Sequence, residues 1–297
     1  MRGRTCILVA TSLSMICVPS RADFKYTQSG QFTNGVAKAK EAFGTQATEV
    51  TIYVKGASLR IDLPDGMYGI IDLEGQRDIQ VDPKTWTYSV AKFDDIRARD
   101  KAASQQFPSH ITEDIKPTAT STGKTQTLLG QTAQDTNVGL QHNAADSLII
   151  DSWIAPSVGG FKEVSGFYER LASALRGTSD PSGTDAARFP GIHAVAELMM
   201  ASELSANSFT VWPAVMSKGI LDLCKIANAP DGLPLVQTYQ EYGVKPGSPD
   251  KELGFEFTLR ATSFSADSLD EQLFRIPPGY TDSHQSVRDM WIVGLSQ

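Results

Sequence analysis

Residues that could do chemistry are few and lie far apart in this chain. The four histidines, His110, His142, His193 and His284, form no HExxH motif and no pair three or four residues apart, so they predict no local metal site. No GxSxG sequence marks a nucleophilic serine. A Ser-His-Asp site assembled from distant residues stays open as an alternative, because such a site is defined by geometry. We therefore expect no catalytic residue, no cofactor and no metal ion, and a protein that is not an enzyme.

One short motif resembles part of a phosphate-binding loop. Residues 121–125 read Ser-Thr-Gly-Lys-Thr, but the loop needs a second glycine five residues before Gly123, where Thr118 stands. The loop also needs a strand before it and a helix after it, whereas a polar stretch precedes this motif and a β-type run follows it. The match is therefore interpreted as chance, and no nucleotide site is predicted.

A second group, Asp146, Asp151 and Trp153, invites comparison with a glycosidase, which uses two carboxyl groups and an aromatic sugar platform. Asp151 and Trp153 alternate with apolar Ile150 and Ile154, so they share one face of a predicted strand. Glycoside hydrolysis needs two carboxyl groups that face each other across the sugar. Two acids on one strand do not supply this arrangement, and we interpret them as solvent-facing.

The first 22 residues have the three parts of a secretory signal peptide. Arg2 and Arg4 precede an apolar run at residues 6–18, and Ser20-Arg21-Ala22 offers small residues for cleavage. The run is shorter than the roughly 20 residues that span a bilayer. Ile16 before Cys17 argues against lipid attachment. We expect cleavage after Ala22 and an unlipidated periplasmic or secreted protein.

Charge and cysteine content restrict the partners. The chain has a net charge of −7, and loss of residues 1–22 removes three arginines and no acid, which leaves −10. This charge disfavours nucleic acids and anionic lipid surfaces. No later stretch is long and apolar enough to cross a membrane. Cys224 would be the one cysteine left, in an apolar stretch, so we expect a buried thiol and no disulfide within the chain.

Short alternating segments up to residue 155 predict an antiparallel meander. They are separated by turn sequences such as Pro64-Asp65-Gly66, and in the segment at 85–90 Trp86, Tyr88 and Val90 fall on one face. Residues 97–125 are charged and then rich in Thr and Ser, which predicts an exposed connection. Strand patterns return at 125–129, 134–142 and 147–154.

The period changes to that of helices near residue 160. Apolar residues from Phe161 to Leu175 have helical spacing, and Pro190 and Pro213 each begin a further predicted helix, which gives a helical block near 160–228. Strands are predicted again at 233–242 and 255–263. Because long βαβ alternation is absent, we predict one α+β domain over residues 23–297 in place of a Rossmann-type sheet.

Several short segments follow one another along the chain: residues 53–56, 59–62, 71–73, 82–83, 122–125, 129–130, 151–156, 166–168, 232–235 and 277–280, with Tyr88. In this order they resemble a family of secreted bacterial proteins of unknown function with the architecture of LolA/LolB-type lipoprotein carriers. The resemblance covers most of residues 45–282 and brings no catalytic residues. It implies a strongly curved antiparallel sheet, an unclosed barrel, with helices packed on its concave face. It also implies that Lys124 belongs to the entrance of a strand.

A carrier of this type suggests a groove between the sheet and the helices that binds a lipid or another apolar ligand. Burial of hydrocarbon there would contribute about 25 cal/mol per Å². Two other functions stay open: an envelope structural or interaction protein whose sheet packs dry on its helices, and a secreted hydrolase. The groove residues that we predict come from apolar strand and helix positions. They are Trp86, Tyr88, Trp153, Phe161, Met199 and Met216.

Overall fold

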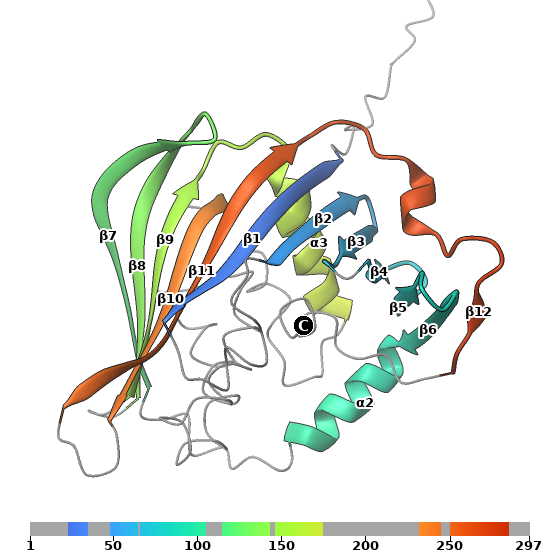
Figure 1. Ribbon diagram of the computed structural model, residues 1–297, viewed down its shortest axis with the longest axis horizontal. Helices are drawn as coiled ribbons and strands as arrows, with labels where there is room; N and C mark the ends of the chain where they lie inside the picture. Colours follow the sequence, from blue (N-terminus) through green and yellow to red (C-terminus); the bar gives the residue numbers. More distant parts are fainter. Residues whose placement is uncertain are drawn as a thin grey trace, which may run out of the picture.

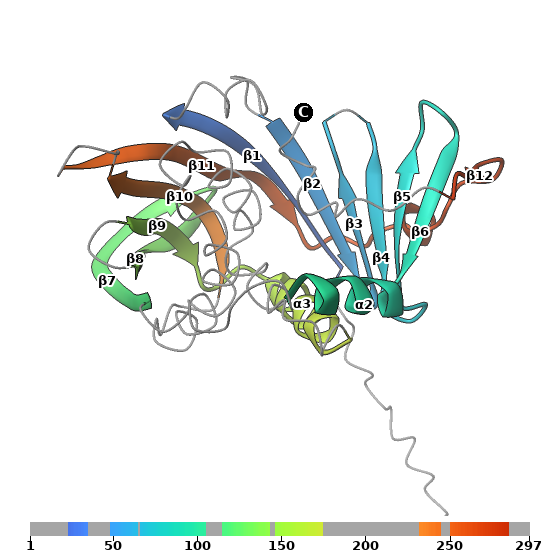
Figure 2. The same ribbon diagram turned by 90° about the horizontal axis from the view of Figure 1, so that it is seen from below.

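The computed structural model describes residues 23–34, 48–64, 66–104, 115–142, 146–174, 232–244 and 250–284. Within these residues a single twelve-stranded sheet has the order β12-β6-β5-β4-β3-β2-β1-β11-β10-β9-β8-β7, and every neighbouring pair is antiparallel except β12 with β6. Figures 1 and 2 show that the sheet is strongly curved and that its two edges do not meet. The unclosed, curved antiparallel sheet of the prediction is thus confirmed.

One half of the sheet is a regular meander, as the alternation and turn sequences predict. Its strands follow each other along the chain and are joined by tight turns, because residues such as Gly56 accept a positive φ at the turn. The strands are β2 (Thr48–Lys55), β3 (Ser58–Asp62), β4 (Tyr68–Asp72), β5 (Arg77–Asp82) and β6 (Thr87–Lys92).

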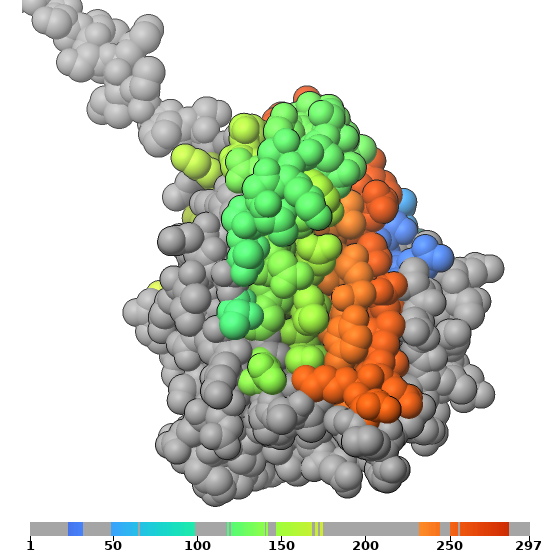
Figure 3. Space-filling view, turned by 90° about the vertical axis from the view of Figure 1, so that its left-hand side faces the viewer, coloured from blue at the N-terminus to red at the C-terminus, as the bar shows by residue number. Residues whose placement is uncertain are grey.

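The other half combines distant parts of the chain. The first described strand, β1 (Phe24–Asn34), lies in the middle of the sheet and pairs with β2 on one side and with β11 (Lys251–Ser265) on the other. The remaining strands are β7 (Ile115–Leu128), β8 (Gln131–His142), β9 (Asp146–Ala155), β10 (Leu233–Val244) and the two-residue β12 (Thr281–Asp282). Figure 3 shows the outside of β7 to β11 as one continuous surface.

A first core cluster forms where α3 (Phe161–Ala174) packs on one face of the sheet. Of the apolar positions predicted for this helix, Phe161, Val164 and Leu171 are buried in it, together with Phe167, which the spacing does not single out. Phe24 lies completely buried in the same cluster, with its ring centroid 6.1 Å from that of Phe161. The helix expected from residue 161 is therefore present. The other helices expected in the block near 160–228, and Cys224, lie outside the described residues.

A second core cluster lies on the opposite face of β4 and β5. Ile70 and Ile79 belong to it, whereas the neighbouring Ile71 belongs to the first cluster, because successive side chains of a strand point to opposite faces. This face is covered by Phe274, Ile276 and other residues of the C-terminal segment, which we define as residues 266–284. The segment includes a 3-10 helix (Glu271–Phe274) and β12.

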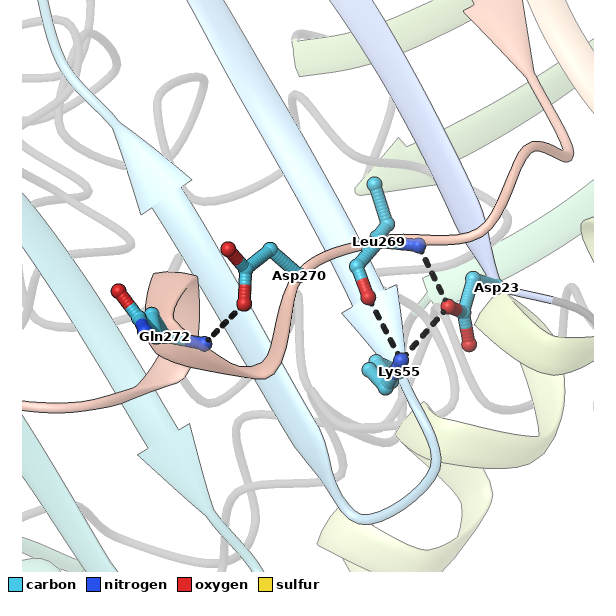
Figure 4. A network of polar contacts seen from close by, with 5 residues as sticks. All are labelled: Asp23, Lys55, Leu269, Asp270 and Gln272. Atoms are coloured by element: carbon cyan, nitrogen blue, oxygen red, sulfur yellow. Dashed lines mark hydrogen bonds and ion pairs between the residues drawn. The ribbon is translucent and has the colours of Figure 1, made fainter.

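Polar contacts fasten the C-terminal segment to the start of β1 and the end of β2 (Figure 4). The Nζ atom of Lys55 donates to Asp23 Oδ2 at 3.0 Å and to the carbonyl oxygen of Leu269 at 2.6 Å, while the backbone N–H of Leu269 donates to Asp23 Oδ2 at 2.7 Å. Arg60 adds a hydrogen bond to the carbonyl oxygen of Leu273 at 3.0 Å. Two charged side chains thus satisfy backbone groups of a segment that forms few regular hydrogen bonds of its own.

The predicted exposed connection at residues 97–125 contains regular structure. It includes the end of α2 (Phe93–Ser104) and most of β7, the long strand at one edge of the sheet. Threonine has a high β propensity, so a Thr-rich stretch can pair as a strand although it shows no apolar alternation. The expected exposure does hold for its side chains from residue 120 to 127.

In the described part of the chain, no helix combines the length and the apolar character that a membrane crossing requires. Residues 1–22, where the signal peptide is predicted, lie outside the described residues.

Candidate functional site

The predicted groove residues are distributed over separate places. Phe161 lies in the first core cluster, and Trp153 packs against that cluster while partly buried. Tyr88 packs against the second core cluster on the other face of the sheet. Trp86 is 61% exposed, and Met199 and Met216 lie outside the described residues. The described part of the chain therefore brings Phe161 and Trp153 to one cluster but does not join them with Trp86 and Tyr88.

Trp86 does not share a strand with Tyr88, which corrects the expected alternation. Strand β6 begins at Thr87, and Trp86 lies in the preceding turn with a φ of +57°. A left-handed φ is rare for a bulky residue and interrupts the alternation of a strand, so a count of every second residue cannot foresee it.

The largest set of buried side chains outside the first cluster forms an apolar row across four strands. Val138, Ile150, Tyr239 and Phe257 lie directly opposite each other on β8, β9, β10 and β11, and each is at most 1% exposed. Leu259 lies two residues from Phe257 and Ala261 two residues further along β11. Because Ala261 belongs to the first cluster, the row lies on the sheet face that α3 covers elsewhere.

A polar row lies next to the apolar row on the same face. Thr136, Ser152 and Gln237 are directly opposite each other on β8, β9 and β10, and each is 1% exposed. The Gln237 side chain donates from Nε2 to Ser152 Oγ at 3.1 Å and accepts at Oε1 from the Tyr239 hydroxyl at 3.1 Å. Thr136 Oγ1 is buried and has no hydrogen-bond partner among the residues that the structure describes. Native proteins rarely leave such a hydroxyl unsatisfied, so this one calls for a physical explanation.

A pair of carboxyl groups lies on β8 and β9, at positions that alternate along these strands with those of the polar row. Asp135 stands opposite Trp153, and Asp151 stands two residues from Trp153. Asp135 is 4% exposed and accepts at Oδ2 from the Thr122 hydroxyl at 2.6 Å, while its Oδ1 atom has no other partner. Burial, the hydrogen bond with Asp135 and its negative charge raise the pKa of Asp151 from 3.8 to about 6, against the opposing effect of Lys124. The pair therefore shares a proton below about pH 6.

The motif at residues 121–125, which resembles a phosphate-binding loop, lies on β7 next to Asp135 of this carboxyl pair. Ser121 pairs with Thr136 and Thr125 with Gln134, so Thr122, Gly123 and Lys124 form a bulge opposite the single residue Asp135. Gly123 takes a φ of +73° in this bulge. The motif is thus a structural element of β7, which agrees with the expectation that it holds no phosphate. Lys124 lies within the strand and not at its entrance.

Asp151 stands out in the sequence together with Asp146, but Asp146 is not the acid that lies beside it. Asp146 lies at the beginning of β9 opposite His142, whereas Asp135 on β8 meets Asp151. Thr136, Ser152 and Gln237 are also missed, because each looks like an ordinary polar strand residue. Only the register of β8, β9 and β10 shows that they form a row. Among the described residues, no three His, Cys, Asp or Glu side chains gather into a group that could hold a metal ion.

Comparison with known proteins gives no family for the chain. No model of a protein family matches it, and no curated protein does. Among solved structures, the chain is similar to PNGF-II in space group C2, at 11% identity and a TM-score of 0.30, over 88% of this chain and 31% of that chain. The chain thus spans less than a third of PNGF-II.

A second solved structure is an outer membrane lipoprotein-sorting protein domain from Vibrio parahaemolyticus. Its identity to this chain is 7% and its TM-score is 0.27, over 86% of this chain and 90% of that chain. Both TM-scores are too low to carry an argument. The resemblance to the carrier architecture therefore stays a prediction.

Proposed function

We propose that this protein is a non-enzymatic binding protein, acting in the periplasm or outside the cell, for a lipid or another apolar ligand that carries a hydrogen-bonding group. In this proposal the helices cover the concave face of the sheet, and the ligand lies between them and the apolar row. Its polar group meets the polar row. No cofactor or metal ion takes part.

The observation that carries the proposal is the unsatisfied hydroxyl of Thr136. Its Oγ1 atom is buried without a partner beside Ser152 and Gln237, and next to a row of large apolar side chains. Leaving a buried polar group without a hydrogen bond costs about 1–3 kcal/mol. A ligand that forms a hydrogen bond with the Thr136 hydroxyl would remove this free-energy cost.

The chemistry around Thr136 is typical of a small-molecule site. Such sites are mostly apolar, with a few polar groups that fix the orientation of the ligand. Tyr239 and Phe257, whose ring centroids are 6.3 Å apart, supply a large apolar surface next to the polar row. The side chains of Thr136, Ser152 and Gln237 are uncharged, so they suit a hydroxyl, ester or amide group.

Two other functions from the sequence analysis compete with this proposal. In an envelope structural or interaction protein the same face would be a dry core, and the Thr136 hydroxyl would only reduce stability. A secreted hydrolase would need a nucleophile and a base within hydrogen-bond reach of each other. Asp135 and Asp151 share a proton, but the burial of Asp135 suits it poorly for contact with a substrate.

The test combines ligand detection with the isosteric change Thr136→Val. We expect native mass spectrometry of protein purified from its own host to show a retained lipid. We expect Thr136→Val to weaken the binding of a fluorescent fatty-acyl probe while the empty protein melts at the same or a higher temperature, because valine removes an unsatisfied hydroxyl at equal volume. Thr120→Val on the exposed part of β7 is the matched control and should change neither.

A dry core gives a different result. The wild-type protein would then retain no lipid and bind no acyl probe, and Thr136→Val would only raise the melting temperature. That outcome would replace the binding function by the structural one.

A further inference from the structure

Trp86 is exposed in a way that packing does not explain. It is one of two large hydrophobic side chains that are exposed in the described part of the chain, at 61%, and the other is Leu129 at 45%. Its φ of +57° lies in the left-handed region, which is strained for a bulky residue. Glycine or asparagine would occupy this position with less strain. The turn therefore holds an aromatic ring in solvent at a cost in stability.

The turn around Trp86 is fixed by a dense set of hydrogen bonds. The carboxylate of Asp82 accepts from the Lys84 backbone N–H at 2.8 Å and from the Thr85 hydroxyl at 2.9 Å. The Thr85 and Thr87 hydroxyl oxygens are 2.7 Å apart. On the far side, the backbone N–H of Thr281 donates to the carbonyl oxygen of Trp86 at 3.1 Å. The position of the indole is thus set before any ligand arrives.

A second aromatic ring supports the indole. Tyr280 lies in the C-terminal segment, and its ring centroid is 5.4 Å from that of Trp86, with the ring planes inclined by 36°. Tyr280 also packs against the second core cluster, so the folded sheet anchors it. The two rings come from distant parts of the sequence and meet only because β12 pairs with β6.

Three threonines neighbour the two aromatic residues along the chain or in the pairing of β6 with β12. Thr85 and Thr281 are exposed, and Thr87 is half-buried directly opposite Thr281. An aromatic face attracts the slightly positive C–H groups of a sugar ring, because the face carries the negative end of the ring quadrupole. Hydroxyl groups both donate and accept, which matches the hydroxyl groups at the edge of a sugar.

We propose that Trp86 and Tyr280, with the threonine hydroxyl groups beside them, form a binding site for an uncharged saccharide chain. This site is independent of the proposed lipid-binding function, since the apolar row and the polar row lie on other strands. The protein would then bind a glycan in addition to its apolar ligand.

A membrane surface fits these residues less well than a saccharide. Insertion into a bilayer interface uses an extended apolar face with basic residues around it. Here a single exposed aromatic side chain stands in a turn with one acid and one base, Asp82 and Lys84, and near Asp282 on β12, so there is no extended apolar face and no excess of basic residues. The same acids disfavour a phosphate-bearing ligand.

The experiment uses Trp86→Asn, with Leu129→Asn as a matched control. Both substitutions remove a large exposed side chain at a positive φ, +57° and +48°, where asparagine fits well. The probes are cellohexaose, chitohexaose and maltohexaose, and binding is measured by isothermal titration calorimetry. We expect the wild-type protein to bind at least one of them and Trp86→Asn to bind it about tenfold more weakly or not at all. Leu129→Asn should bind like the wild-type protein, and both variants should keep the wild-type melting temperature or exceed it.

Tyr280→Phe serves as the second variant if Trp86→Asn fails to fold. It keeps the ring and should keep the affinity, whereas Tyr280→Ala should lose it. The proposal is overturned if the wild-type protein binds none of the three oligosaccharides at millimolar concentration, or if Trp86→Asn binds as tightly as the wild-type protein. Binding to phosphatidylcholine or phosphatidylglycerol vesicles that depends on Trp86, without oligosaccharide binding, overturns it in favour of a membrane contact.

Discussion

The shared proton of Asp135 and Asp151 makes one side chain report on pH. Burial of Asp151, its hydrogen bond with Asp135 and the negative charge of Asp135 raise the pKa of Asp151 from 3.8 to about 6. Between these values the folded protein keeps a proton that the unfolded chain releases. The folded state thus binds more protons, and stability falls as the pH rises through this window.

We predict that Asp151→Asn removes this part of the pH dependence. The amide does not titrate, and its NH₂ group can donate to Asp135 Oδ1, the atom that otherwise lacks a partner. Melting temperatures from pH 3.8 to above 6 should decline more steeply in the wild-type protein than in the variant. Glu74→Gln, at an exposed position in the turn before β5, is the control and should follow the wild-type curve. Equal slopes for all three proteins would exclude the shared proton.

Single residues also show the limit of reasoning from sequence. Trp86 is misplaced because the sign of φ is not visible in a pattern of apolar residues. Asp135 is missed because its meeting with Asp151 depends on the register of two strands, which long-range pairing decides. Phe161 is buried on the helix face that helical spacing identifies, while its place in a ligand groove stays a prediction.

At the scale of elements, local sequence patterns predict strands and helices well, whereas the composition of a segment is misleading. The meander from β2 to β6 and the start of α3 follow from alternation, turn residues and helical periodicity. Most of β7 escapes prediction, apart from its last residues, which belong to the strand predicted at 125–129, because an edge strand with exposed polar side chains needs no apolar alternation. The bulge at residues 122–124 hides the pattern further, since it shifts the pairing with β8.

The bulge of β7 yields a prediction for Gly123. A Cβ atom at this position would meet nothing within 4 Å, so Gly123→Ala tests the backbone alone at a φ of +73°. We expect a loss of about 1–2 kcal/mol in the free energy of unfolding, measured by urea denaturation.

Gly159→Ala is the matched control, because its added Cβ also meets nothing within 4 Å while its φ is not left-handed. Alanine there reduces the freedom of the unfolded chain and should leave stability unchanged or raise it by up to about 1 kcal/mol. Similar losses at both glycines would mean that the bulge does not need a left-handed residue.

At the scale of the whole molecule, β1 joins the two halves of the sheet. It lies between β2 and β11, and Gln28, 6% exposed, pairs with Val50 on one side and with Ala261 on the other. We predict that Gln28→Pro destabilises the protein by about 3 kcal/mol or more, since proline lacks the N–H that a central strand needs. Gln28→Ala, which keeps this N–H, is the control.

The same variant tests whether the halves unfold together. Hydrogen exchange followed by mass spectrometry should show β4–β5 and β8–β9 losing protection to the same degree in Gln28→Pro. Loss in one half alone would show that the sheet consists of two independent units.

The position of β1 also sets the order in which the molecule can assemble. Phe24 to Asn34 emerge from the ribosome early, but their partner β11 ends at Ser265, so one side of β1 stays open until almost the whole described chain has been made. Pairing over such a distance is slow, because the intervening chain must lose its freedom before the contact forms. Until then an unpaired central strand can join the wrong neighbour. A chaperone that holds the chain unfolded during synthesis or export would therefore be needed most before β11 has been synthesised.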